Sequence, residues 1–453
     1  MNGVSIAADQ LEPAVQRIGR ELHDALPGRR GPLEALDDRA MDFAASDDQL
    51  RAALFRFVDV VPACRGLDDL ASHLTHFLEE VPERPPSLDA AMRVAHTRAG
   101  RAALGAAAAA GVRRMAHRFI IGTDPQDAVG HLRGLWRRGA AASVDLLGEA
   151  TVTHSEADAY AARCDDALRT LTAAATRWPG RPLLEDDGLG RLPRANLSVK
   201  VSALTPLLRP EAPERGVIDA AGRLRPLLRT ARDRGAHLHI DMESLDSREA
   251  VLELILELLA EPEFVPGPSA GLVLQAYLRD SPEQLERILA FSGQAGRASP
   301  LTVRLVKGAY WDHEVVEARQ HGWEVPVFED KAACDRNFET LTRRLVGARV
   351  DGVPVRPAIA SHNLRSVAHA IAYHRLSGAP DEALELQVLR GLGDPLEEAL
   401  VRLGLRVRTY CPIGELVAGM AYLVRRLLEN TANESFLADL QRGAPVQELL
   451  AAP

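Results

Sequence analysis

Residues 236–277 read AHLHIDMESLDSREAVLELILELLAEPEFVPGPSAGLVLQAY. The segment begins with a short apolar run at 236–243, continues as an amphipathic helix from Ser247 to Leu259, and ends in a second apolar run at 271–277. Neighbouring parallel strands need a helical crossover, so two short apolar runs separated by a helix are typical of them. This stretch therefore predicts a β-α-β unit.

The same alternation continues on both sides of this unit. Later helices are expected at Ser281–Phe291, Glu329–Val346 and Leu364–Leu376. Eight strands that alternate with helices predict an α/β protein with a (β/α)8 barrel of the TIM type. The strand-like runs are 141–149, 196–204, 236–243, 271–277, 301–309, 357–363, 384–390 and 407–412.

Residues 1–140 show helical periodicity with few β-branched runs, and we interpret them as a helical accessory region or arm. The catalytic barrel is then expected at 141–440, followed by a C-terminal tail at 441–453.

Composition narrows the class of protein. The net charge of −9 and the lack of a basic block argue against a nucleic-acid partner. The four cysteines form no Cys-x-x-Cys pair, and the first residues do not resemble a secretion signal, so we expect a cytoplasmic protein without structural zinc. The sequence contains no apolar run of about 18 residues, the length that would predict a membrane span.

Polar side chains stand where the predicted strands end. In barrels of this kind the chemistry lies at the C-terminal ends of the strands. The residues expected there are Glu149, Lys200, Asp241, Gln275, Lys307, His362, Arg390 and Tyr410.

The last predicted helix, GELVAGMAYLVRRLLENTAN at 414–433, is apolar on all sides from Leu416 to Leu428 except at Arg425 and Arg426. A helix of this kind is a buried helix, and a buried guanidinium needs an anion. Glu429 can satisfy part of one arginine, which leaves the other free to bind a carboxylate. The alternative is that both arginines reach solvent along the surface.

The run LTVRLVKGAYWD at 301–312 places Arg304 in mid-strand and Lys307 at the strand end, and Gly308 lets the backbone approach a ligand closely. Two such cations suggest an anionic or electron-rich ligand. The alternative is that Arg304 pairs with a neighbouring acidic residue.

Two other site classes are compatible with single motifs. His237 and His239 alternate onto one strand face as a metal site would, but they lie toward the N-terminal end of the strand, so we expect structural histidines and no metal. Lys200 and Lys307 could form Schiff bases, as in a lyase, but a pair between Lys200 and Asp241 is simpler. A non-catalytic interaction scaffold is disfavoured because many polar residues converge on one mouth.

Six strings, NLSVKVSAL, HIDME, VLQAY, RLVKGAYWD, ASHN and YLVRRLLEN, occur in this order and at these strand ends. Together they resemble the proline dehydrogenase family. The resemblance covers about residues 116–440, from MAHRFIIGTDP through SVDLLGEATVT, and is similar to the proline dehydrogenase part of bacterial bifunctional proline-utilisation enzymes.

The resemblance implies an FAD cofactor and the substrate L-proline. Glu149 matches the gating partner of Arg425, and Asp241, Arg304 and Lys200 match catalytic positions. The substrate-binding positions are Lys200, Leu305, Tyr310, Tyr410, Arg425 and Arg426. The cofactor-binding positions are Gln275, Arg304, Val306, Lys307, Gly308, Ala309, Trp311, Lys331, Ser361, His362, Asn363 and Glu429.

The implied reaction is hydride transfer from C5 of proline to flavin N5, which yields pyrroline-5-carboxylate, the first step of proline catabolism to glutamate. The resemblance also implies a quinone-type electron acceptor, peripheral contact with the inner membrane, and an aldehyde dehydrogenase domain or partner for the product. The alternative substrate is another cyclic imino acid, such as hydroxyproline, pipecolate or a biosynthetic intermediate. Tyr410 favours the unsubstituted ring, because relatives that prefer hydroxyproline tend to have a smaller residue there.

Two features depart from the family pattern. Glu329 and Asp330 stand where relatives usually have Thr and a basic residue, although both acids suit the start of a helix. The segment 183–194, LLEDDGLGRLPR, is longer than in typical bacterial relatives and is expected to be a surface loop.

Overall fold

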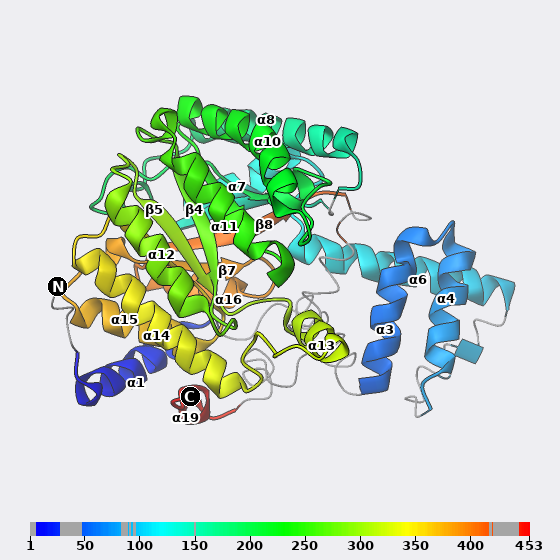
Figure 1. Cartoon of the computed structure of the whole chain (residues 1–453). Helices are drawn as coiled ribbons and strands as arrows, with labels where there is room; N and C mark the ends of the chain where they lie inside the picture. Colours follow the sequence, from blue (N-terminus) through cyan, green and yellow to red (C-terminus); the bar gives the residue numbers. More distant parts are fainter. Residues whose placement is uncertain are drawn as a thin grey trace.

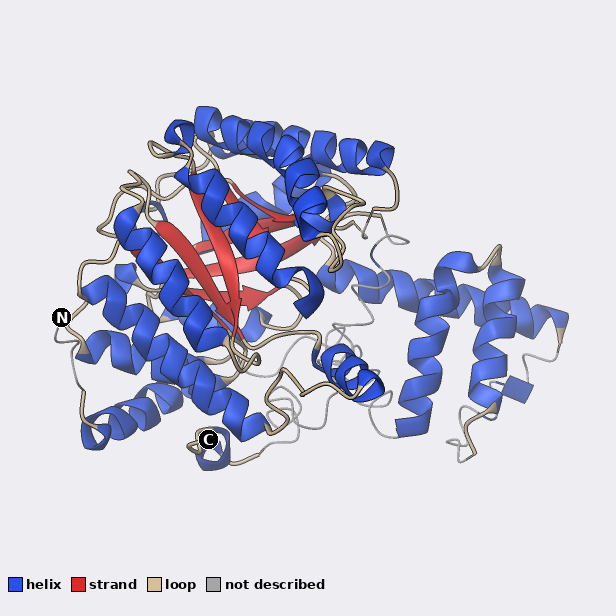
Figure 2. Ribbon diagram, in the orientation of Figure 1, coloured by secondary structure: helices blue, strands red, loops and turns tan. Residues whose placement is uncertain are grey.

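The computed structural model describes residues 6–27, 48–82, 97–148, 151–415 and 444–453, together with residues 89, 92, 93 and 419. A barrel of strands enclosed by helices forms the larger part of the molecule, and helices α3 (Asp48–Val60), α4 (Leu67–Glu79) and α6 (Arg98–Phe119) project to one side (Figures 1 and 2).

Eight parallel strands close the barrel in sequence order, which confirms the predicted (β/α)8 fold. Each strand overlaps one of the eight predicted runs. The register places Lys200 beside Asp241 and places Asp145 beside Ser198, so charged and polar residues of neighbouring strands meet near one end of the barrel. The strands are β1 (Ala140–Leu146), β2 (Asn196–Lys200), β3 (His237–Asp241), β4 (Ser269–Gln275), β5 (Leu301–Val306), β6 (Val355–Ala360), β7 (Glu385–Leu389) and β8 (Val407–Ile413).

Helices cover the outside of the barrel. Local signals set their ends: Thr153 and Glu156 form a capping box at the start of α8, and α7 ends at Gly139, whose φ of 107° suits glycine. The helices are α7 (Pro125–Arg138), α8 (His154–Ala175), α9 (Pro182–Glu185), α10 (Pro213–Arg234), α11 (Leu245–Ala260), α12 (Ser281–Gln294), α13 (Trp311–His321), α14 (Lys331–Val350), α15 (Leu364–Leu376) and α16 (Asp394–Arg402), with short 3-10 turns η2 (Val201–Ala203), η3 (Pro262–Phe264) and η4 (Asp381–Ala383).

The first and last described helices pack on the barrel. Val15 and Leu22 of α1 (Ala8–Ala25) are fully buried in the main hydrophobic cluster, and Leu450, which follows α19 (Val446–Leu449), joins them. Burial of large apolar side chains is worth about 1.5–3 kcal/mol each, so these contacts hold both segments to the barrel wall.

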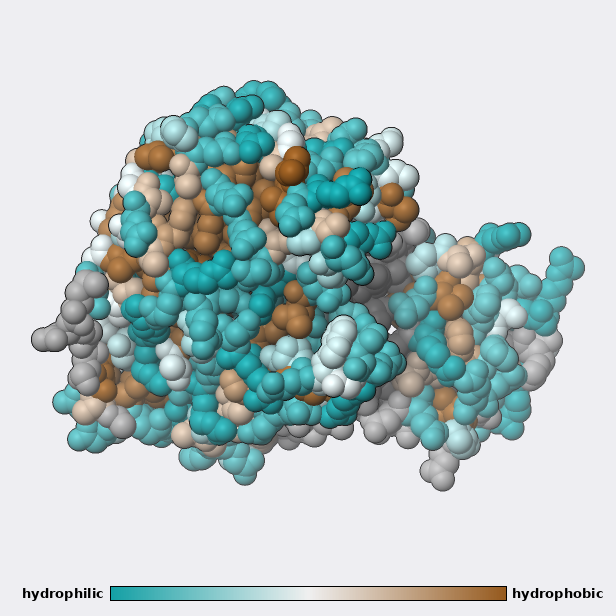
Figure 3. All heavy atoms as spheres, in the orientation of Figure 1, coloured by the Kyte–Doolittle hydropathy of each residue, from teal (hydrophilic) through white to brown (hydrophobic). Residues whose placement is uncertain are grey.

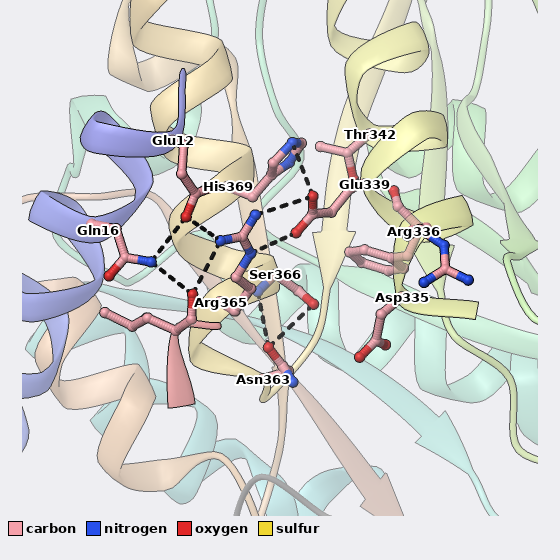
Figure 4. Close-up of polar contacts among 12 residues, drawn as sticks. Glu12, Gln16, Asp335, Arg336, Glu339, Thr342, Asn363, Arg365, Ser366 and His369 are labelled. Carbon is pink, nitrogen blue, oxygen red and sulfur yellow. Dashed lines mark hydrogen bonds and ion pairs between the residues drawn. The ribbon is translucent and has the colours of Figure 1, made fainter. Parts of the chain in front are cut away.

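An ion network reinforces this attachment (Figure 4). The buried guanidinium of Arg365 on α15 donates to Glu339 on α14 at 2.9 Å and to Glu12 on α1 at 2.7 Å. It also donates to the carbonyl oxygen of Leu450 at 3.0 Å. Both outer segments are therefore tied to the helix that starts directly after Asn363.

A second, smaller hydrophobic cluster lies in the projecting helices α3 (Asp48–Val60), α4 (Leu67–Glu79) and α6 (Arg98–Phe119), with the 3-10 turn η1 (Val61–Ala63) between the first two. The far end of α6 reaches the barrel, where Arg118 donates to the carbonyl oxygen of Gly391 at 2.9 Å. The surface of the barrel seen in Figure 3 is mainly hydrophilic. In the described parts of the chain, no helix has both the length and the hydrophobicity that a bilayer crossing requires.

The loop at 183–194 differs from the expected surface loop. Gly188 to Arg191 are exposed, but Asp187 is fully buried at the N-terminal end of the barrel. Its carboxylate accepts from Arg349 at 3.1 Å and from Arg356 at 2.9 Å. The prediction was wrong at this point because one buried aspartate in a polar, glycine-rich stretch has no local sequence signal.

The interior of the barrel is polar near its N-terminal end. Arg408 and Glu385 form a buried bidentate pair with distances of 2.9 and 3.0 Å. Burial alone would raise the pKa of Glu385, but Arg408 and Arg406 lower it to about 2. The structure therefore holds Glu385 charged at all ordinary pH values.

This pair predicts a stability change in acid. The folded pKa of Glu385 is about 2 and the reference pKa is 4.5, so between these values the unfolded chain binds more protons than the folded one. The ionised carboxylate of Glu385 therefore contributes about 3 kcal/mol to the free energy of unfolding. This contribution is fully present above pH 4.5 and is lost as the pH falls toward 2. Urea unfolding at several pH values in this range should therefore show a shallower pH dependence for Glu385→Gln than for the unchanged protein. Glu398→Gln, at an exposed site on α16, should keep the unchanged slope, and equal slopes for all three proteins would contradict the prediction.

Candidate active site

Lys200 and two aspartates meet where β1, β2 and β3 end. The Lys200 ammonium group donates to the carboxylate of Asp145 and lies 3.7 Å from an oxygen of Asp241. Burial lowers the pKa of Lys200, but Asp145 and Asp241 outweigh it and raise that pKa above its usual value. Lys200 is therefore held in its charged form. This argues against a Schiff-base role, which needs a neutral amine.

Asp241 is the centre of a wider network. Its first oxygen accepts from Ser198 at 2.6 Å and from Arg304 at 2.8 Å, and its second accepts from the hydroxyl of Tyr410 at 2.7 Å. Burial raises the pKa of Asp241, but Lys200, Arg304 and the two hydroxyl donors bring it below its usual value. The carboxylate is thus fixed in its ionised form, and its lone pairs are used to orient four neighbours.

Arg304 lies in the barrel interior, below this mouth. Besides Asp241, it donates to Gln387 at 2.7 Å and to Ser143 at 3.3 Å, and its guanidinium carbon lies 5.2 Å from the centre of the Tyr410 ring. Of the two interpretations of Arg304, the ion pair with an acidic neighbour is therefore present. The guanidinium lies over one face of the Tyr410 ring, as in a cation–π contact.

The polar residues expected to contact a cofactor lie at the ends of β4 and β5 and at the start of α14. Gln275 is buried and donates to the carbonyl oxygen of Glu243 at 3.1 Å. Lys307 pairs with the carboxylate of Asp335, which also accepts from Lys331 at 2.9 Å. These contacts fix two cations on one carboxylate, and one of them, Lys307, directly precedes the half-buried Gly308.

Gly308 has a backbone that only glycine adopts easily, with φ at 134°. A Cβ atom at this position would lie 2.3 Å from the ring of Tyr277, which is closer than any real contact. The next residues open outward: Ala309 is exposed, Tyr310 is half-buried, and Trp311 is 39% exposed with its indole donating to the carbonyl oxygen of Phe328 at 2.9 Å.

The turn from β6 to α15 carries Ser361, His362 and Asn363, and all three are half-buried. The Ser361 hydroxyl accepts from the backbone of Asn363 at 3.1 Å, and Asn363 caps α15 by accepting from Ser366 at 3.0 Å. Nε2 of His362 accepts from the backbone N–H of Leu389 at 2.9 Å, so a neutral His362 carries its proton on Nδ1. This turn is a fixed polar surface next to the end of β5.

One predicted site residue lies elsewhere, and an apolar residue at the mouth was not predicted. Leu305 is fully buried in the hydrophobic cluster between strands and helices. It lies on the face of β5 opposite to Arg304, because side chains alternate along a strand, so it cannot contact a ligand at the mouth. Leu389, on the same face of β7 as Gln387 and half-buried, is an apolar residue at the mouth that the sequence analysis missed.

Asp145 was also missed. It stands two residues after Ser143 on β1, so both face the barrel interior, and this alternation in ASVDLL was the signal that could have found it. Glu149, Arg425, Arg426 and Glu429 lie outside the described residues.

The two acids that depart from the family pattern act at the start of α14. Asp330 accepts from the backbone of Ala332 at 3.2 Å and of Ala333 at 3.0 Å, as an N-cap does, and Glu329 pairs with Arg319 at 2.7 Å.

His237 and His239 are buried at the N-terminal end of β3. Nδ1 of His237 lies 2.9 Å from the Ser269 hydroxyl, and its Nε2 lies 3.2 Å from Nδ1 of His239. Burial lowers the pKa of His237 to about 3, so it is neutral. Among the described residues, the one group with three potential metal ligands is Cys64, Asp69 and His73 in the helical arm, and it includes neither of these histidines.

Comparison with known proteins places this chain among enzymes of one family. Residues 128–439 match the family model described as proline dehydrogenase, and residues 12–119 match that of the proline utilization A N-terminal domain. The bifunctional protein PutA of Klebsiella aerogenes is 33% identical over 355 residues, which cover 76% of this chain and 25% of that protein. Proline dehydrogenase 1 of Bacillus subtilis strain 168 is 27% identical over 335 residues, 73% of this chain and 92% of that protein.

A solved structure is also similar over nearly the whole chain. Proline utilization A from Bdellovibrio bacteriovorus, inactivated by N-propargylglycine, has a TM-score of 0.88 and 34% identity over 98% of this chain and 44% of that chain. The chain spans about a quarter of the length of the curated bifunctional relatives.

Proposed function

Because the chain belongs to the proline dehydrogenase family, we propose that it oxidises L-proline to pyrroline-5-carboxylate with FAD as the first electron acceptor. The observation that supports this most is the buried group of Lys200, Asp145, Asp241 and Arg304 at the active end of the barrel, within the residues that match the family. This group places two cations beside two carboxylates in the barrel interior.

The residues at the ends of β5 and β6 fit a flavin. Gly308 packs directly against the Tyr277 ring, which fixes the backbone turn at the end of β5, and the half-buried side chains of Lys307, Ser361, His362 and Asn363 offer donors and acceptors to a phosphate-bearing, polar cofactor. We propose that these residues, with Gln275 and Arg304, hold FAD. When bound, FAD supplies at N5 the acceptor for the hydride that leaves C5 of proline.

Each residue of the described site has a role in this proposal. Lys200 remains protonated and binds the substrate carboxylate, with Arg425 and Arg426 as the other two cations. Asp241, whose pKa is held low, is a poor base and serves to position Lys200, Arg304 and Tyr410. Arg304 places a fixed positive charge beside the reacting centre, where it stabilises negative charge that develops during the reaction.

The walls of the site would exclude water and align the substrate ring. We propose that Tyr410, Tyr310 and, in place of Leu305, Leu389 contact the aliphatic carbons of proline. We further propose that Glu149 pairs with Arg425 when substrate is absent. A quinone-type acceptor, an aldehyde dehydrogenase domain or partner, and a cytoplasmic location peripheral to the inner membrane belong to the same proposal.

Gly308 gives a direct test of the cofactor site. Gly308→Ala should reduce flavin affinity about tenfold, because a positive φ costs an L-residue about 1–2 kcal/mol and the added methyl group displaces the Tyr277 ring. The flavin-to-protein absorbance ratio after dialysis measures this. Gly322→Ala is a matched control, since Gly322 also has a positive φ, 67°, but its Cβ would face open space. Wild-type flavin retention by Gly308→Ala would contradict the placement.

The substrate is tested by a panel of cyclic amino acids. L-proline, hydroxyproline and pipecolate are supplied in turn with a soluble quinone, and kcat/KM is measured for each. We expect the highest value for L-proline. A higher value for another ring, with little turnover of proline, would replace L-proline by that substrate and leave the flavin proposal standing.

A further inference from the structure

The N-terminal end of the barrel, opposite the proposed active site, holds a buried arginine, Arg406, with two nitrogen atoms that make no hydrogen bond to the described residues. Arg406, which precedes β8, is 2% exposed, yet its Nε and Nη1 atoms have no hydrogen-bond partner among the residues that the structure describes. Burial lowers the pKa of Arg406 to about 10, so its side chain still carries a positive charge at neutral pH. An unpaired buried cation costs several kcal/mol.

The nearby carboxylates Glu385 and Asp187 attract Arg406, but each is hydrogen-bonded to other arginines. Arg356 uses its Nε and Nη2 on Asp187, but its Nη1 is also buried and unpaired within the described part of the chain. Glu385 is held by Arg408. Four guanidinium groups, with Arg349 as the fourth, thus face two carboxylates, and two positive charges lack a carboxylate among the described side chains.

A cavity connects these unpaired groups. Its volume is about 20 Å³, and Arg356, Arg406, His239 and Asn196 contribute to its lining. A cavity of about 10–15 Å³ holds one water, so this cavity has room for one or two particles of that size. A tetrahedral oxyanion with five heavy atoms is too large for it.

His239 adds a further unpaired nitrogen. Nδ1 of His237 lies 2.9 Å from the Ser269 hydroxyl and its Nε2 lies 3.2 Å from Nδ1 of His239, so Nε2 is the ring nitrogen of His239 outside this chain of contacts. That atom is buried and has no partner in the described residues. Side chains from β3, β6 and the segment before β8 therefore bring unpaired nitrogen atoms to one small cavity, and the two guanidinium groups among them are donors.

We propose that this cavity binds a single monatomic anion, chloride under ordinary conditions, between Arg406 and Arg356. A water molecule would satisfy hydrogen bonds but would leave the excess of two positive charges, whereas a halide ion supplies an acceptor and reduces that excess to one. The site lies at the end of the barrel that serves stability in this fold class, so the anion acts on folding and has no part in proline oxidation.

The test uses the full chain as purified, with bromide as the probe. Crystals soaked in bromide should show an anomalous peak within hydrogen-bonding distance of Arg406 and Arg356. At constant ionic strength, exchange of gluconate for bromide should raise the melting temperature by about 2–4 °C in a saturable way.

Arg406→Met should lose this response, and in gluconate it should be at least as stable as the unchanged protein, since a buried unpaired charge has been removed. Arg344→Met, which removes an exposed arginine on α14, should respond to bromide as the unchanged protein does. The proposal is overturned by the absence of the bromide peak, by a carboxylate of the chain in its place, or by an equal bromide response in Arg406→Met. If Arg406→Met does not fold, the bromide peak in the unchanged protein decides.

Discussion

Asp241→Ala is expected to reduce kcat/KM for proline by at least about 100-fold and to lower the free energy of unfolding by about 3–5 kcal/mol. The stability loss follows because the carboxylate accepts from Arg304 and lies beside Lys200, and its removal leaves Arg304 without an ion partner in the described interior. The loss of activity follows because Arg304, Lys200 and Tyr410 all depend on Asp241 for their orientation.

Asp246→Ala is the matched control. Asp246 is exposed in the first turn of α11, close in sequence to Asp241, and its removal should cost about 0.3–1 kcal/mol with unchanged turnover. Asp241→Asn keeps the shape of the side chain, so it shows the effect of the charge if the alanine variant does not fold. An unchanged kcat/KM in Asp241→Asn would contradict the proposal that the Asp241 carboxylate positions its neighbours.

Arg426→Met is expected to raise KM for proline about 100-fold with little change in flavin content. A bidentate pair between a guanidinium and a carboxylate contributes about 1.5–3 kcal/mol per charged hydrogen bond, and methionine supplies none of it. Lys200 still contacts the substrate carboxylate in this variant, but it is shared with Asp145 and Asp241 and cannot supply the lost bidentate pair. Steady-state kinetics and the flavin absorbance of the same preparation measure the two effects.

Arg402→Met, at an exposed site on α16, controls for a general loss of positive charge and should leave KM unchanged. Equal losses of proline and FAD binding in Arg426→Met would show that the residue does not act as a substrate ligand.

The fold was predictable from the sequence because strand and helix periodicities are local. The βαβ pattern at 236–277 set the parallel topology, and the strand ends then placed Lys200 and Asp241 at one mouth, where the register confirms them as neighbours. Arg304 illustrates the limit: its position in mid-strand was clear, but the choice between a ligand and an ion pair depended on which strands face one another across the barrel.

The residues that were missed or misplaced share one physical cause. Asp145, Gln387 and Leu389 enter the site through the alternation of side chains and the stagger of the strands, and a sequence states neither directly. Leu305 was assigned to the site by resemblance, but its neighbour Arg304 faces inward, so Leu305 faces the helices. Asp187 lies in a loop, and its burial depends on two arginines more than 160 residues away in the sequence.

The account depends on a flavin that is reduced by proline at this barrel mouth. The direct measurement is an anaerobic titration of the purified chain with L-proline, followed by its visible spectrum. We predict a yellow protein whose flavin absorbance is bleached stoichiometrically by L-proline and is unaffected by D-proline. A chain that binds no flavin, or whose flavin stays oxidised at saturating L-proline, would contradict the account.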